Sequence, residues 1–380
     1  MSRRSRLARF AEYVLDRSLL LVAGAVAALI WANVAHASYV RVAEPLHFLV
    51  NDVGMVFFFA LAAKEVFEAT LPGGPLASMR RAAVPLIAAA GGMLAPALIY
   101  LGLVHGLGDV RLARGWAIPC ATDIAFSYLV ARAIFGTRHA AVPFLLLLAI
   151  ADDALGLIIL ALFYPSGQIR LIEFFGLLAL ALAIAAWLHR RRTRSYWPFV
   201  VVAGAVSWIA FERGGFHPAL ALVPIIPFIP HAVRGHELMQ ETRRHDPLTL
   251  FEHQWKTPVQ AILFFFGLVN AGVPVGGIGP GTWIVLAAIV AGKPIGIVLS
   301  TAAASVARLH RPAGLGWRDL LVVGCVAGIG FTVALFFTTA AFPADHPLLD
   351  QTKMGALLSF GATIPGFALA WLLGVGRFER

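Results

Sequence analysis

The stretch AVPFLLLLAIADDALGLIILALF, residues 141–163, decides how the rest of the chain is interpreted. It is apolar over about the 20 residues that a helix needs to cross a bilayer. Two adjacent carboxylates, Asp152 and Asp153, stand eleven and twelve residues into it, near the expected midplane. A charge at that depth costs roughly 2.5–3.5 kcal/mol on insertion scales, so it indicates a function by default. The stretch therefore predicts a membrane helix that carries ion-binding or proton-carrying groups.

Similar apolar runs recur along the whole chain. Of its 380 residues, 59% are hydrophobic and 13% are charged, whereas a soluble domain has about 25% charged residues. We expect one integral membrane domain over residues 1–380, an all-α polytopic protein with twelve crossings. The expected spans are Leu19–Ala35, Phe48–Thr70, Ala82–His105, Gly115–Phe135, Ala141–Phe163, Leu171–Leu188, Trp197–Phe211, His217–Ile229, Gln254–Val273, Trp283–Val306, Leu320–Ala341 and Thr352–Gly374.

The distribution of basic residues predicts the orientation, because cytoplasmic loops carry an excess of Lys and Arg. With the N-terminus inside, 22 of the 30 basic residues fall on the cytoplasmic side, six on the other side and two inside spans. Both termini are then cytoplasmic, with a cytoplasmic tail at 1–17 and a cytoplasmic central loop at 231–253. The basic residues form small clusters between spans, which favours membrane lipid and excludes nucleic acid as a partner.

Further polar residues are expected at membrane depth. Lys293 lies ten residues into its span, about 15 Å deep at 1.5 Å per residue, and needs a counter-charge, for which the two aspartates are candidates. Thr122 and Asp123 follow Pro119 in the middle of another span. Gly328 and Gly330 interrupt the span at 320–341 in a corresponding place. Two interrupted spans predict inverted repeats with broken helices at the midplane, where Asp123 would balance positive helix N-termini.

The motifs GWAIPCATDIAF at 115–126, LLAIADDALGLIILALFY at 147–164, NAGV at 270–273, AGKPIGI at 291–297 and AGIGFTVALF at 327–336 resemble those of the bacterial NhaA sodium/proton antiporters, in that order and over nearly the whole chain. The resemblance implies a fold in which two broken helices cross at the midplane. It also implies a location in the bacterial inner membrane. The transported species would be Na+ or Li+ and protons, with no cofactor.

The resemblance also implies roles for individual residues. Asp153 would be the principal ion and proton site, and Asp152 would pair with Lys293 or assist in binding Na+ as its second carboxylate ligand. Thr122 and Asp123 would occupy the crossing of the broken helices.

Regulation by pH is implied for a second set of residues. Glu65 and Glu252 stand in the places of the family's funnel glutamates, and Glu68 replaces a further one that falls on Ala69. His217 resembles the family's periplasmic-end histidine.

One feature of the family does not carry over. Only eighteen residues separate Asn33 from Asp52, too few for the β-hairpin through which family members dimerise, so dimerisation is left open.

We therefore expect a secondary active transporter, and not an enzyme, that exports Na+ in exchange for protons by alternating access, electrogenically and under pH regulation. The alternative within transport is cation- or proton-coupled movement of a small organic solute, which would need a larger polar pocket than the few polar residues at membrane depth suggest. A membrane-embedded hydrolase would need a nucleophile and a base, and no histidine lies beside the aspartates in sequence.

Overall fold

A computed structural model describes residues 19–107, 109–231, 246–343 and 346–378 of the chain. Within these ranges the regular structure is helical, which confirms the expected all-α class. The main helices are α2 (Leu19–Val34), α3 (His36–His47), α4 (Met55–Thr70), α5 (Met79–Leu107), α6 (Ile124–Phe135), α7 (Ala141–Phe163), α8 (Leu171–Arg190), α9 (Gly204–Gly214), α10 (Pro247–Asn270), α11 (Pro280–Val306), α12 (Trp317–Ala327), α13 (Phe331–Ala341), α14 (Leu349–Leu358) and α15 (Thr363–Leu373).

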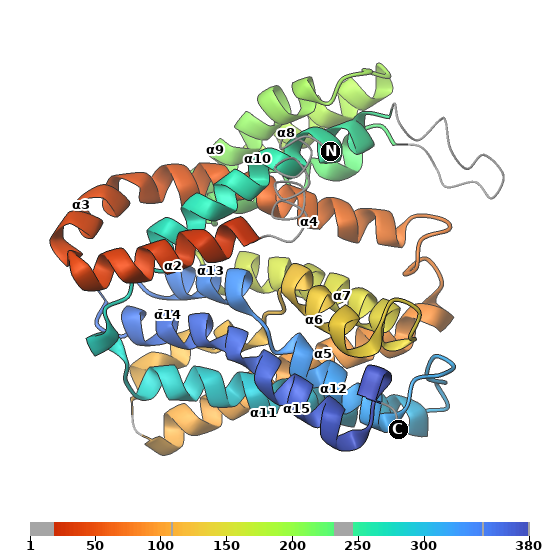
Figure 1. Ribbon diagram of the computed structural model, residues 1–380. Helices are drawn as coiled ribbons and strands as arrows, with labels where there is room; N and C mark the ends of the chain where they lie inside the picture. The colour runs from red at the N-terminus through yellow and green to blue at the C-terminus, as the bar shows by residue number, and fades with distance from the viewer. Residues whose placement is uncertain (1–18, 108, 232–245, 344–345, 379–380) are drawn as a thin grey trace, which may run out of the picture.

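The helices form two layers, which Figure 1 shows one above the other. The upper layer, here the α4 layer, contains α2, α3, α4, α8, α9 and α10, and the lower layer, here the α7 layer, contains α5–α7 and α11–α15. Helix α4 packs directly against α7 and joins the layers. One end of the molecule carries α3 and is called the α3 end. The other carries the segments 190–194, 308–318 and 376–378 and is called the arginine-rich end, because these segments contain eight arginines.

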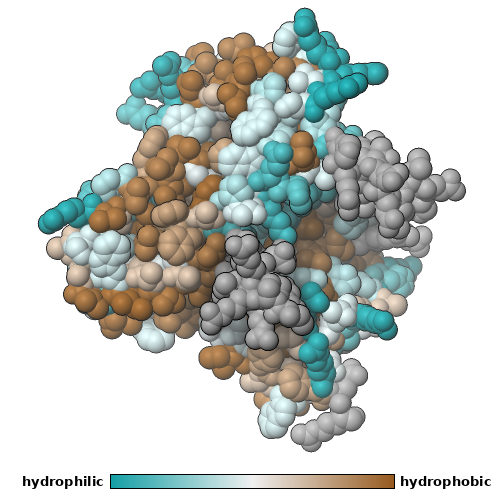
Figure 2. All heavy atoms as spheres, turned by 45° about the horizontal axis from the view of Figure 1, so that its top comes forward, coloured by the Kyte–Doolittle hydropathy of each residue, from teal (hydrophilic) through white to brown (hydrophobic). Residues whose placement is uncertain are grey.

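Six helices are long and apolar enough to cross a membrane, or eight if each of two bent pairs counts as one span. The expected count of twelve is therefore not confirmed, although α7 has the predicted bounds, Ala141–Phe163. Figure 2 shows brown apolar side chains over large parts of the surface. Ile172 on α8 is 91% exposed and Val306 on α11 is 86% exposed, as expected for helices that face lipid.

Three segments differ from the expected pattern. Residues 217–229, expected to cross the membrane, form only two short 3-10 turns, Pro218–Leu220 and Ile226–Phe228, because prolines recur through the segment and interrupt helical hydrogen bonding. Residues 247–253 of the expected central loop are the first turns of α10, and residues 232–245 lie outside the described ranges, as does the expected tail at 1–17.

The third segment lies between the first two expected spans. It forms α3 and a π-helical segment, η1 (Phe48–Gly54), which continues into α4. There is thus no β-hairpin between Asn33 and Asp52, all of which the structure describes.

Small residues bring α5 and α11 close together and fix the position of Lys293. A Cβ atom on Gly296 would lie 2.1 Å from the Gly91 carbonyl oxygen, and one on Gly292 would lie 2.5 Å from Pro96 Cα. Glycines of this kind let membrane helices approach at backbone distance. The helix that carries Lys293 is therefore packed backbone to backbone against its neighbour.

Candidate ion-binding site

Two helix breaks meet in the middle of the α7 layer. The segment Val110–Cys120 bends by 55° to α6, and α12 bends by 50° to α13, so both expected interruptions are confirmed. The Asp123 backbone N–H donates to the Ile329 carbonyl at 2.6 Å, from one break to the other. A Cβ atom on Gly330 would lie 3.0 Å from the Ala121 carbonyl oxygen, so the breaks touch where glycine leaves room.

The Asp123 carboxylate lies between the first turns of α6 and α13. It accepts hydrogen bonds from the Phe126 and Thr332 backbone N–H groups, both at 3.3 Å, and from the Thr332 hydroxyl. Helix N-termini carry partial positive charge, which a carboxylate stabilises. Asp123 thus serves both half-helices at once, in the arrangement expected from the sequence.

Lys293 and Asp152 form an ion pair that is almost completely shielded from solvent. Lys293 Nζ lies 2.7 Å from Asp152 Oδ2 and donates to Thr122 Oγ1 at 2.8 Å. Their side chains are 0% and 1% exposed. The Thr122 hydroxyl lies 2.7 Å from Asp152 Oδ2 and 2.9 Å from the Ala327 carbonyl, and can donate to either. The expected pairing of Lys293 with an aspartate is confirmed.

The other Asp152 oxygen has no such partner. Asp152 Oδ1 is buried and makes no hydrogen bond within the described part of the chain. A buried acceptor without a donor calls for a water molecule or an ion. Asp152 and Asp153 line a cavity of about 20 Å³, which is enough for one water molecule.

Asp153 faces this small cavity and a second cavity of about 280 Å³. It makes no hydrogen bond and no ion pair with any residue that the structure describes. The larger cavity runs between the layers from Asp153 to Glu252, in the second turn of α10, and is therefore directed toward the arginine-rich end. Adjacent residues on a helix point about 100° apart, so one aspartate is held by Lys293 while its neighbour faces the cavities.

Toward the α3 end, aromatic rings close the path from Asp153. Phe59 and Phe336 both line the small cavity, and their ring centroids are 4.8 Å apart. Phe266 stacks on Phe336 at 6.1 Å, and the His217 ring lies 4.8 Å from Phe336. Asp153 is thus connected to one end of the molecule and sealed from the other.

A family model described as Na+/H+ antiporter 1 matches residues 9–370. The chain belongs to this family. It is similar to the protein named Na(+)/H(+) antiporter NhaA of Desulfitobacterium hafniense (strain DSM 10664 / DCB-2), with 45% identity over 97% of each chain. The protein of the same name from Jannaschia sp. (strain CCS1) is 44% identical over 97% of this chain and 99% of its own. The protein named Na(+)/H(+) antiporter NhaA 2 of Pelobacter propionicus (strain DSM 2379 / NBRC 103807 / OttBd1) is 46% identical over 95% of this chain and 97% of its own.

A solved structure has the same fold. It is the structure of the sodium proton antiporter MjNhaP1 from Methanocaldococcus jannaschii at pH 8. The two structures align over 97% of this chain and 96% of that chain, with a TM-score of 0.59. At 16% identity this is a likeness of fold. Membership of the antiporter family implies a transporter and not an enzyme, and the apolar helices indicate a bacterial membrane protein.

The expected pH-regulating residues of this antiporter family member fall into two places. Glu65 and Glu252 line the larger cavity. Glu68 joins them through Lys64, whose Nζ lies 2.9 Å from Glu68 Oε2 and contacts Glu252 Oε2. His217 lies apart from this cluster, on the far side of the Phe336 ring.

Sequence reasoning missed three residues at these places. Lys64 is 4% exposed and bridges two glutamates, although the depth rule that singled out Lys293 also applies to it. Asp52 Oδ1 lies 3.9 Å from His217 Nδ1, a contact between segments that no local pattern reveals. Lys353, one of the six basic residues expected on the outer side, is instead buried at 7% exposure within α14.

Proposed function

We propose that this chain exports Na+, or Li+, in exchange for protons across the bacterial inner membrane. Both termini and the arginine-rich end would face the cytoplasm. The observation that carries the proposal is Asp153, an intramembrane carboxylate without a partner among the described residues, at the meeting point of two cavities. Its neighbour Asp152 is held by Lys293 but keeps one oxygen free.

The free oxygens suit a small hard cation, because such cations prefer carboxylate, carbonyl and water oxygens. Asp153 and Asp152 Oδ1 would supply ligands for Na+, with Thr122 beside them. The same carboxylates take up protons when the cation leaves. Because cation and proton compete for the same oxygens, binding of one displaces the other, and the exchange becomes obligatory.

The exchange would also move net charge. Two groups, either both carboxylates or Asp153 and Lys293, would carry two protons for each Na+. Each cycle would then move one more positive charge in the direction of the protons than in the direction of Na+. Each charge that crosses the membrane is worth about 2.3 kcal/mol per 100 mV. An inside-negative membrane potential would then drive protons inward and Na+ outward.

Alternating access would use the contact between the two layers. In the conformation described, the larger cavity leads from Asp153 toward the arginine-rich end, and Phe59, Phe336 and His217 close the opposite path. A movement of the α7 layer against the α4 layer would close the cavity on the arginine-rich side and open the path on the α3 side. Asp153 would then be accessible from the α3 end and no longer from the arginine-rich end.

Regulation by pH would act at the cavity that leads to Asp153. Glu65, Glu68 and Glu252 gather around Lys64 on α4 and α10, so their protonation changes the charge that an entering cation meets. His217 would sense the opposite side through its neighbour Asp52.

The proposal is tested by Na+-dependent exchange in inverted membrane vesicles, followed with a pH-sensitive dye that dequenches when protons leave the lumen. Asp153→Asn should reduce the signal to that of vesicles without the protein. Asp109→Asn is the matched control and should leave exchange unchanged, because it removes a partly exposed carboxylate that pairs with Arg111 at the start of the 3-10 helix Val110–Gly115, away from both aspartates. Undiminished exchange in Asp153→Asn would refute the assignment. Repeating the assay with the membrane potential clamped to zero tests whether net charge moves.

A further inference from the structure

The chain contains four lysines, and one of them lacks a partner. Lys64 and Lys293 form ion pairs, and Lys256 also interacts with a neighbouring residue. Lys353 is 7% exposed, yet it makes no hydrogen bond or ion pair with the residues that the structure describes. Burying an ammonium group is unfavourable unless a counter-charge or hydrogen-bond acceptors replace its water shell. In this conformation the Lys353 ammonium has therefore lost most of its water shell without gaining a counter-charge at ion-pair distance.

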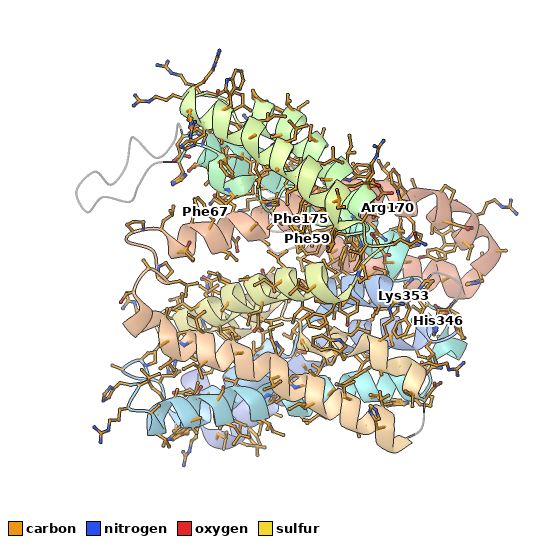
Figure 3. The ribbon with its side chains drawn as sticks, turned by 180° about the vertical axis from the view of Figure 1, so that it is seen from behind. Phe59, Phe67, Arg170, Phe175, His346 and Lys353 are labelled. Atoms are coloured by element: carbon orange, nitrogen blue, oxygen red, sulfur yellow. The ribbon has the colours of Figure 1, made fainter. Side chains whose placement is uncertain are left out.

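Lys353 lies one turn into α14, at the α3 end. Figure 3 shows it with His346 and Arg170 at that end, with Phe67 at the opposite end and Phe59 between them. Its charge interacts with that of Asp350, on the preceding turn of α14, and with His47 on α3. Because α14 belongs to the α7 layer and α3 to the α4 layer, Lys353 is buried where the two layers meet.

The helices that pack against α14 in its own layer offer no carboxylate, and Glu44, the carboxylate of α3, is exposed and forms no ion pair with Lys353. Helices α11 and α13 pack against α14. Lys293 is the one ionisable residue in the sequence of α11, and α13 has none. Asp350 is near but does not reach ion-pair distance, and a histidine cannot neutralise an ammonium. Closure of the α3 end thus places a charge between the layers without neutralising it.

The polar groups near His47 are already committed to one another. Asn51 and Asn270 exchange amide hydrogen bonds of 3.1 and 2.8 Å, and Asn51 Nδ2 lies 3.1 Å from His47 Nδ1. The Tyr39 hydroxyl donates to the Val269 carbonyl at 2.7 Å. These contacts connect α3, η1 and α10 within the α4 layer. None of them provides an acceptor for the lysine of the facing layer.

We propose that Lys353 is the charge that favours opening of the α3 end. The inference rests on the alternating access proposed above. When the layers part at that end, water reaches Lys353 and restores its solvation, so the open arrangement gains stability relative to the closed one. Lys353 is then a positioning residue for the conformational step and does not bind the transported ion.

Sidedness of amine labelling tests the exposure directly, because the lysines are few and lie at different places. Right-side-out vesicles are treated with a membrane-impermeant N-hydroxysuccinimide ester, and acylation of each lysine is measured by peptide mass spectrometry. We expect Lys353 to be acylated from the outside and the cavity-lining Lys64 and Lys256 only in inverted vesicles. Lys293 serves as the buried reference. Acylation of Lys353 no faster than that of Lys293, from either side, would overturn the proposal.

A pair of variants tests the energetic part. Lys353→Met removes the unpartnered charge, so we expect a higher melting temperature together with a turnover about tenfold lower and no increase in the KM for internal Na+. A tenfold change corresponds to about 1.4 kcal/mol. Lys353→Arg keeps the charge and should keep the turnover. The control is Arg170→Met, which removes an exposed cation at the same end that pairs with Glu173 at 3.4 Å.

The two proposals fail in distinguishable ways. If the native chain shows no Na+-dependent exchange, the proposed function is wrong, whereas labelling and melting temperature do not depend on exchange. If native exchange is normal but Lys353→Met matches the native chain in turnover and melting temperature, the role of Lys353 is wrong.

Discussion

Removal of Lys293 should destabilise the protein far more than removal of an exposed cation with the same ion-pair distance. Lys293 Nζ lies 2.7 Å from Asp152 Oδ2, and Arg111 Nη2 lies 2.7 Å from Asp109 Oδ2. The first pair is 0% and 1% exposed and the second 67% and 32%. Breaking a buried pair costs about 3–5 kcal/mol because the remaining charge is uncompensated, whereas water compensates an exposed partner. Burial, and not distance, therefore decides the expected result.

The expected shift in melting temperature follows from this cost. An unfolding entropy of about 2.1 cal/mol/K per residue gives about 0.8 kcal/mol/K for 380 residues. We therefore expect Lys293→Met to lower the midpoint by about 5 °C, at a cost of about 4 kcal/mol. A thiol-reactive fluorogenic dye provides the assay, because both cysteines, Cys120 and Cys325, are free and buried in the folded protein. Arg111→Met should leave the midpoint unchanged.

A double variant separates the charge effect from loss of packing. Lys293→Met combined with Asp152→Asn removes both charges, so most of the lost stability should return, to within about 2 kcal/mol of the native chain. The reasoning is refuted if the double variant melts as early as Lys293→Met alone, or if Lys293→Met melts with the native chain.

Two further predictions concern packing and polar contacts within the layers. Gly296→Ala places a methyl group 2.1 Å from the Gly91 carbonyl oxygen and should cost about 1–3 kcal/mol; Gly102→Ala on α5, with no atom within 4 Å, should melt like the native chain, and equal melting of both variants would contradict the close contact. Asn51→Ala removes the donor to the buried Asn270 Oδ1 and one of the two acceptors of Asn270 Nδ2, and should cost about 1–3 kcal/mol in the same assay. Asn51→Ala with Asn270→Leu should recover part of that loss, and failure to recover any would argue against the amide pair.

Much of the α7 layer could be predicted from the sequence. Helix α7 has the expected bounds, because the apolar run of Ala141–Phe163 is uninterrupted except by the paired aspartates. The depth of Lys293 predicted an ion pair with an aspartate. The choice of Asp152 as its partner came from the family resemblance, because a helix alone does not show which of two adjacent side chains faces a neighbour.

Other features depend on contacts that hydropathy does not encode. Mean hydropathy is high over residues 217–229, yet this segment forms short 3-10 turns and not a membrane-spanning helix, because its prolines interrupt helical hydrogen bonding. The Lys64 cluster joins residues that are 188 positions apart, and its partner Glu252 was expected in a loop. The lack of a hydrogen-bond or ion-pair partner for Lys353 could not be predicted, because it depends on the side chains of every helix packed around it, and the sequence does not show which helices those are.

The crossing of the two breaks has a consequence for biogenesis. The Thr332 groups that bond to Asp123 lie 209 residues further along the chain. At about 5–20 residues per second, synthesis of that interval takes roughly 10–40 s. Throughout that time the first break is in the membrane without the second, and its free backbone N–H and carboxylate need other partners. The ion site is therefore completed only when nearly the whole chain has been made, so a nascent chain that stops before Thr332 keeps an unsatisfied polar break at membrane depth.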